Sequence, residues 1–108
     1  MKEKILKIVK EIINEFNKPE VDNILKQIPE EELKLLNPFQ NGIINYKKFF
    51  RLALEEKNYE KIDWKKFNTQ FLRGLVERVY EKNNDIGEKL RIKVVVKLNN
   101  IEELITEI

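Results

Sequence analysis

The sequence contains no histidine, no cysteine and no serine. Without cysteine there is no disulfide, no zinc–thiolate site and no thiol nucleophile. Without histidine the chain lacks the usual general base near neutral pH and the commonest transition-metal ligand. The aliphatic hydroxyls are limited to Thr69 and Thr106, which have no histidine to activate them. We therefore expect a protein that is not an enzyme, holds no metal or cofactor and takes no small-molecule substrate.

Long apolar runs, glycine and proline are also scarce. No apolar run approaches the ~20 residues that span a membrane, and residues 1–16 lack the apolar centre of a signal peptide. We expect a cytoplasmic protein with no membrane partner. Only three Gly and three Pro stand against 37% charged residues, a composition that favours helices with charged outer faces. The sequence predicts an all-α fold, a compact bundle of five to seven helices that forms a single helical domain over residues 1–108.

The net charge of +2 is unevenly distributed along the chain. Residues 1–43 carry a net charge of −1, residues 44–97 carry +6 and residues 98–108 carry −3. Acidic residues are interspersed throughout the basic middle region, so it differs from the continuous basic tail of many nucleic-acid-binding proteins.

A six-residue pattern occurs twice, as INYKKF at residues 44–49 and IDWKKF at residues 62–67. Each copy predicts a helix start, because Asn45 and Asp63 are preferred N-cap residues. The apolar residue before each cap and the phenylalanine at the end of each copy have the spacing of a hydrophobic staple. The repeat therefore predicts two consecutive helices that place aromatic side chains in a common core. It points to architecture rather than to chemistry.

Apolar periodicity predicts the remaining helices. Residues 2–16 form the clearest amphipathic pattern. Pro19 favours a second helix that ends near Gln27, and Pro29 opens a short third helix that begins with three glutamates at residues 30–32. We interpret this acidic triplet as solvated helix-end charge rather than a metal cluster, because consecutive residues on a helix point in different directions. Residues 37–43 form a loop.

The two repeat helices are expected at residues 45–57 and 63–82. The second is expected to be the longest and most central helix, with Trp64, Phe67 and Phe71 buried. Residues 90–98 alternate as a strand does, yet they also fit a helix that begins with a capping box at Asp85 and Glu88. A helix is favoured because no second alternating run offers a partner strand; the alternative is a short C-terminal strand at residues 90–98. A short closing helix is expected from Asn100.

Residues 37–48 resemble an EF-hand loop followed by its exiting helix. The resemblance covers residues 30–54, and the matching loop positions are the first, fifth, sixth and eighth, occupied by Asn37, Asn41, Gly42 and Ile44.

Two ligand positions of that loop depart from the pattern. Phe39 stands at the third position, and Lys48 replaces the bidentate glutamate at the twelfth. The resemblance therefore implies a metal-free hand of the light-chain kind, which binds a partner helix, and we expect no Ca²⁺ binding. The alternative is a helix–turn–helix with an Asn-Gly turn.

Residues 24–82 are also similar to a helical part of the large subunits of some type I CRISPR effector complexes. The similarity comprises IPEEEL at residues 28–33, KIDW at residues 61–64 and the long amphipathic helix that follows. It implies a helical piece that packs on neighbouring subunits and on a nucleic-acid backbone.

These observations favour a non-enzymatic helical interaction module, a small subunit or adaptor of a larger assembly. Its partner is expected to be another protein or a second copy, bound through the apolar residues 90–108. Nucleic acid is the alternative partner, because a basic edge on the two repeat helices offers contacts to phosphates. The candidate interaction residues on that edge are Lys47, Lys48, Arg51, Lys65, Lys66 and Arg73.

Overall fold

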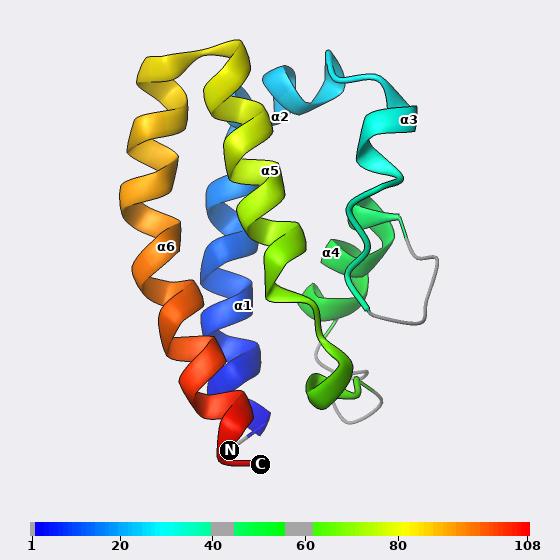
Figure 1. The fold of residues 1–108 in the computed structure, drawn as a ribbon, viewed down its shortest axis with the longest axis vertical. Helices are drawn as coiled ribbons and strands as arrows, with labels where there is room; N and C mark the ends of the chain where they lie inside the picture. Colours follow the sequence, from blue (N-terminus) through cyan, green and yellow to red (C-terminus); the bar gives the residue numbers. More distant parts are fainter. Residues whose placement is uncertain (1, 40–44, 56–61) are drawn as a thin grey trace.

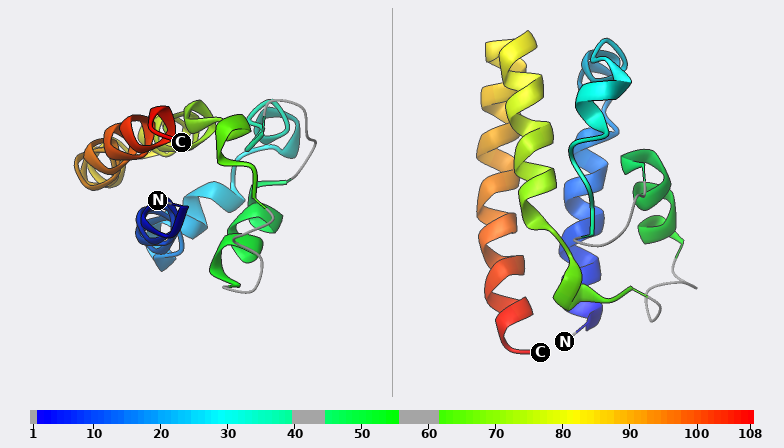
Figure 2. Two further views of the ribbon diagram at one scale, coloured as in Figure 1. Left: turned by 90° about the horizontal axis from the view of Figure 1, so that it is seen from below. Right: turned by 45° about the vertical axis from the view of Figure 1, so that its right-hand side comes forward.

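Three long helices lie side by side and form the larger part of the structure (Figures 1 and 2). The computed structural model describes residues 2–39, 45–55 and 62–108. The helix α6 (Asn84–Thr106) packs against both α1 (Lys2–Phe16) and α5 (Thr69–Lys82) and runs antiparallel to them. The shorter helices α2 (Pro19–Lys26), α3 (Glu30–Leu33) and α4 (Tyr46–Leu54) lie to one side of this layer. The fold is an all-α bundle, as the sequence predicts.

The core consists of apolar stripes from five helices and the aromatic residues of the second repeat. On α1 the stripe that the periodicity predicts is buried except for Ile8, which is partly buried, and on α6 Leu90, Val94, Leu98 and Ile101 continue one buried stripe. Trp64, Phe67 and Phe71 are buried, which confirms that prediction. Pro19 stands at the start of α2, also as predicted.

The helix predicted over residues 63–82 is interrupted, so that prediction is wrong in its first turn. Trp64–Lys66 form a short 3₁₀ turn, η2, and Phe67 is extended and forms an isolated antiparallel bridge with Phe39. The backbone N–H of Asn68 donates to the Pro38 carbonyl at 2.8 Å, and its side chain donates to the Asn37 carbonyl at 3.0 Å. The chain leaves the helix here because these long-range bonds satisfy backbone groups that a helix would otherwise pair.

Both predicted N-caps of the repeat are present. The side chain of Asn45 accepts from the Lys47 N–H at 2.8 Å, and that of Asp63 accepts from the Lys65 N–H at 3.2 Å. Ile62 and Phe67, the two ends of the second staple, are buried; Ile44 of the first staple lies outside the described residues. The first repeat helix ends at Leu54, earlier than predicted, because Glu55 already has an extended backbone.

Residues 90–98 are helical, which confirms the favoured alternative over the strand. The helix α6 extends without a break through Asn100, so the separate closing helix is wrong. The expected capping box is also wrong, because Asn83 caps α6 by accepting from the Ile86 N–H at 3.1 Å. With 23 residues, α6 rather than the second repeat helix is the longest helix in the described part of the chain.

Candidate interaction groove

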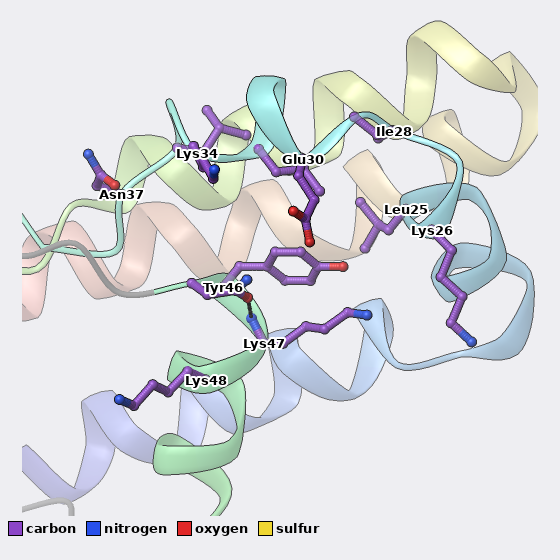
Figure 3. Close-up of a pocket in the computed structure, with 12 residues that line it drawn as sticks. Leu25, Lys26, Ile28, Glu30, Lys34, Asn37, Tyr46, Lys47 and Lys48 are labelled. Carbon is purple, nitrogen blue, oxygen red and sulfur yellow. Dashed lines mark hydrogen bonds between the residues drawn. The ribbon is translucent and has the colours of Figure 1, made fainter.

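A groove lies between the three short helices, on the side of the molecule away from α6. The walls of its larger part come from the end of α2, from α3 with the chain that follows it, and from the first turn of α4 (Figure 3). The end of α1 and the later turns of α4 line its smaller part. Pro29 directs the chain from α2 into α3, since its fixed φ suits a helix start. The cap at Asn45 sets the position at which α4 begins.

The groove consists of two adjoining hollows of about 460 and 350 Å³. The hollows share Leu25, Lys26, Tyr46 and Lys47, so they adjoin each other. Aliphatic side chains and rings form its floor, from Leu25, Ile28, Leu33, Leu36, Tyr46 and Phe50. An apolar floor of this kind is typical of surfaces that bind other molecules.

The walls of the groove are predominantly basic. Five cationic side chains line the two hollows, against only two carboxylates, Asp22 and Glu30. Asp22 is already paired with Lys26 at 3.0 Å. Of the five cations that line the hollows, Lys34, Lys47, Lys48 and Arg51 have no carboxylate within 4.0 Å in the described part of the chain.

Several basic side chains of the long helices form ion pairs with carboxylates of the fold. Arg91 contacts Glu77 and Glu88 at 3.0 and 3.1 Å and also lies over the ring of Tyr80. Lys97 contacts Glu11 at 3.0 Å, joining α6 to α1. Arg91 and Lys97 are therefore less available to a partner than the groove cations that lack a carboxylate within 4.0 Å.

Tyr46 lines both hollows and therefore marks the centre of the groove; Figure 3 shows it among the residues of the larger hollow. Its ring packs edge-on against Phe50, with centroids 5.5 Å apart, and only 6% of the residue is exposed. Burial raises the pKa of the Tyr46 phenol, and the negative charge of Asp22 raises it further. The hydroxyl therefore stays protonated at neutral pH, and no other described residue hydrogen-bonds to it.

The structure divides the candidate interaction residues into three groups. Lys47, Lys48 and Arg51 line the groove. Lys65 and Lys66 are exposed on η2 and do not line it.

Arg73, the sixth candidate, serves a structural contact. Its guanidinium donates to Glu102 at 3.0 Å and to Asn99 at 2.8 Å, which joins α5 to α6. It is therefore less available to a partner than the lysines of the groove.

Two wall lysines and the role of Tyr46 were not predicted from the sequence. Lys26 and Lys34 belong to other helices and lie beside α4 only in the folded chain. The ring of Tyr46 lies in the core, as the repeat predicts for its aromatic side chains, but the hydroxyl of Tyr46 faces the groove. No sequence signal indicates these placements, because they depend on how α3 packs relative to α4.

The EF-hand-like positions are only partly described. Asn41, Gly42 and Ile44 lie outside the described residues, while Asn37 and Lys48 line the groove. Within the described ranges no three acidic side chains are grouped closely enough to hold a metal ion. The glutamates of the acidic triplet are all exposed, and Glu32 lies 4.0 Å from Arg78.

Comparison of the chain with protein-family models, with curated proteins and with solved structures found no match. Among the described helices, none has the length and apolar character that crossing a membrane requires.

Proposed function

We propose that this chain is a non-enzymatic helical interaction module, a small subunit or adaptor, that binds a partner protein in the groove between α2, α3 and α4. The observation that carries this proposal is the combination of an apolar floor with wall cations that lack carboxylate partners in the described residues. Clustered like charge repels itself and contributes nothing to the stability of the free chain. It attracts a partner of opposite charge and fixes its orientation.

The C-terminal residues 90–108 support a partner less well than the sequence suggests. Their apolar stripe is used inside the fold, where α6 packs on α1 and α5. The exposed apolar residues of α6 are Ile92 and Val96, which lie one turn apart and are 67% and 63% exposed. Single exposed apolar residues are common on folded proteins, so this face is a weaker candidate for self-association than the groove is for a partner.

A nucleic-acid backbone is the second candidate partner. Lys65 and Lys66 are exposed and have no carboxylate within 4.0 Å among the described residues, as is also true of Lys47 and Lys48. Four such lysines suit phosphate contacts, whose contribution falls steeply as salt is added.

Affinity purification from the native cell with matched variants tests the proposal. The groove variant carries Lys34→Glu and Lys47→Glu, and the control carries Lys65→Glu and Lys66→Glu, the same change in charge on η2. We expect the wild type and the control to retain a co-purifying protein that the groove variant loses. A partner lost only from the control, or released by nuclease, would favour nucleic acid. Equal retention by both variants would contradict the assignment to the groove.

A further inference from the structure

We infer that the occupant of the groove is an acidic amphipathic helix of the partner protein, with two or three large apolar side chains along one face. This inference rests on the proposed function and names the chemistry of the partner. Its basis is the agreement between three features of the groove: the charge of its walls, the character of its floor and the donors at its centre.

The wall charges select an acidic ligand. With Lys26 and Asp22 paired to each other, Glu30 is the remaining carboxylate against Lys34, Lys47, Lys48 and Arg51 in the lining of the groove. A basic ligand would meet like charges on α4 and at the end of α3 at once. Carboxylates on the partner would supply the ion pairs that these cations lack within the described chain.

The floor selects a ligand with an apolar face. The larger hollow has a volume of about 460 Å³, and the smaller adds about 350 Å³, within the range of about 300–1,000 Å³ typical of ligand sites. Tyr46 lines both hollows, and two adjoining hollows can each receive an apolar side chain from one face of a bound helix. Helices bind grooves in this way, through anchors spaced three, four or seven residues apart.

The centre of the groove offers a hydrogen-bond donor to a carboxylate. The Tyr46 hydroxyl points into the groove and has no partner in the described chain (Figure 3). The first turn of α4, which lines the same hollow from Asn45 to Lys48, adds the positive end of the helix dipole. A partner carboxylate beside Tyr46 would accept a charge-assisted hydrogen bond, which is stronger than a bond between neutral groups.

A nucleic acid would contact the walls of the groove but not its apolar floor. The ring of Tyr46 is packed against Phe50 and 94% buried, so it offers no free face for base stacking. A sugar–phosphate backbone would satisfy the wall lysines but leave the aliphatic floor exposed to water. An acidic amphipathic helix covers both the walls and the floor.

The test titrates the full chain with a panel of fluorescein-labelled helical peptides and follows anisotropy. Each acidic peptide carries leucine or phenylalanine on one face and glutamate on the other, and each has a matched control in which lysine replaces every glutamate. We expect the acidic peptides to bind and the lysine peptides to fail. The affinity should fall by about tenfold or more between about 0.05 and 0.5 M salt, because the ion pairs are screened.

Variants locate the binding. Lys47→Glu with Lys48→Glu should weaken the peptide by about tenfold or more, since like charge replaces opposite charge. Lys65→Glu with Lys66→Glu should leave the affinity unchanged. Tyr46→Phe should weaken binding about threefold, as expected for loss of one hydrogen bond, with an unchanged melting temperature. The melting temperature of each variant shows whether it remains folded.

Three results would overturn the inference: no acidic peptide binds below about 1 mM, the lysine peptides bind equally well, or a single-stranded oligonucleotide displaces the peptide more effectively than the unlabelled peptide does. If the groove variant loses its cellular partner while no acidic peptide binds, this inference fails and the proposed function stands. If the groove variant keeps its partner and no peptide binds, both fail.

Discussion

The ring of Phe49 stacks on the ring of Phe67, with centroids 5.3 Å apart and planes inclined by 28°. These are the last residues of the two copies of the repeat, so equivalent positions of INYKKF and IDWKKF pack against each other in the core. Both rings also contact Phe39 and Phe71, which joins the chain before α4 to the start of α5. The aromatic rings of the repeat therefore pack the short helices against the long ones, and we call this cluster of Phe39, Phe49, Phe67 and Phe71 the aromatic joint.

A double-mutant cycle measures the strength of this joint. Phe49→Leu and Phe67→Leu, separately and together, should show a coupling of about 0.5–1.5 kcal/mol in the free energy of unfolding, because an aromatic pair contributes this much beyond the area it buries. Urea unfolding followed by circular dichroism gives the four values. The control cycle combines Phe67→Leu with Phe16→Leu, whose ring contacts Phe50 instead. Equal coupling in both cycles would contradict a direct interaction.

Substitution by alanine should have different effects on stability at Gly87 and at Gly74. A Cβ at Gly87 would lie 2.2 Å from the Cα of Tyr80, where α6 crosses the backbone of α5. A Cβ at Gly74 would meet the tip of the Leu36 side chain at 2.6 Å, which can rotate away. Gly87→Ala should therefore lower the free energy of unfolding by about 1–3 kcal/mol or more. Gly74→Ala should leave the free energy of unfolding within about 1 kcal/mol of the wild type, because alanine favours the helix. Thermal unfolding checks both, and equal losses would contradict the close α5–α6 packing.

Phe71 tests the central position of α5. It is buried and contacts the rings of both repeat phenylalanines. Phe71→Ala should cost about 3–5 kcal/mol of stability, through lost burial and the cavity left behind. Leu35→Ala is the control, since Leu35 is 76% exposed, and should change stability by less than about 0.5 kcal/mol. Denaturant unfolding distinguishes the two, and similar costs would mean that Phe71 is not a core residue.

Interactions between neighbouring residues allowed the sequence to predict the helices better than the points at which one helix gives way to the next. The caps at Asn45 and Asp63 followed from residue type and spacing, because capping is a contact between near neighbours. The break at Phe67 did not, because it depends on hydrogen bonds to Asn37 and Pro38 about thirty residues away. Residues 90–98 fit two periodicities, and packing against α1 and α5 favours the helix.

The groove was predicted in part for the same reason. Lys47, Lys48 and Arg51 lie within two turns of one helix, so their common surface follows from sequence spacing. Lys34 reaches the groove from α3, by a tertiary arrangement with no local signal. Arg73 has the same charge as the groove residues, yet its position opposite Glu102 and Asn99 assigns it to the α5–α6 contact.

Calcium provides a test of the EF-hand resemblance. Phe39 and Lys48 occupy two positions at which a Ca²⁺-binding loop requires oxygen ligands. Thermal unfolding with about 5 mM CaCl₂ should therefore superimpose on unfolding in EDTA, because an ion that does not bind the native state cannot stabilise it. Unfolding in MgCl₂ controls for ionic strength. A higher melting temperature in CaCl₂ alone would restore a calcium site in this loop.

Site-specific photo-crosslinking in the native cell tests the central claim most directly. A photoreactive phenylalanine analogue replaces Lys48 in the groove in one variant and Ile92 on the exposed face of α6 in another. If the partner lies in the groove, the variant at position 48 forms a covalent adduct with a protein and the variant at position 92 does not. An adduct formed only from position 92 would contradict the account and assign the interaction to α6.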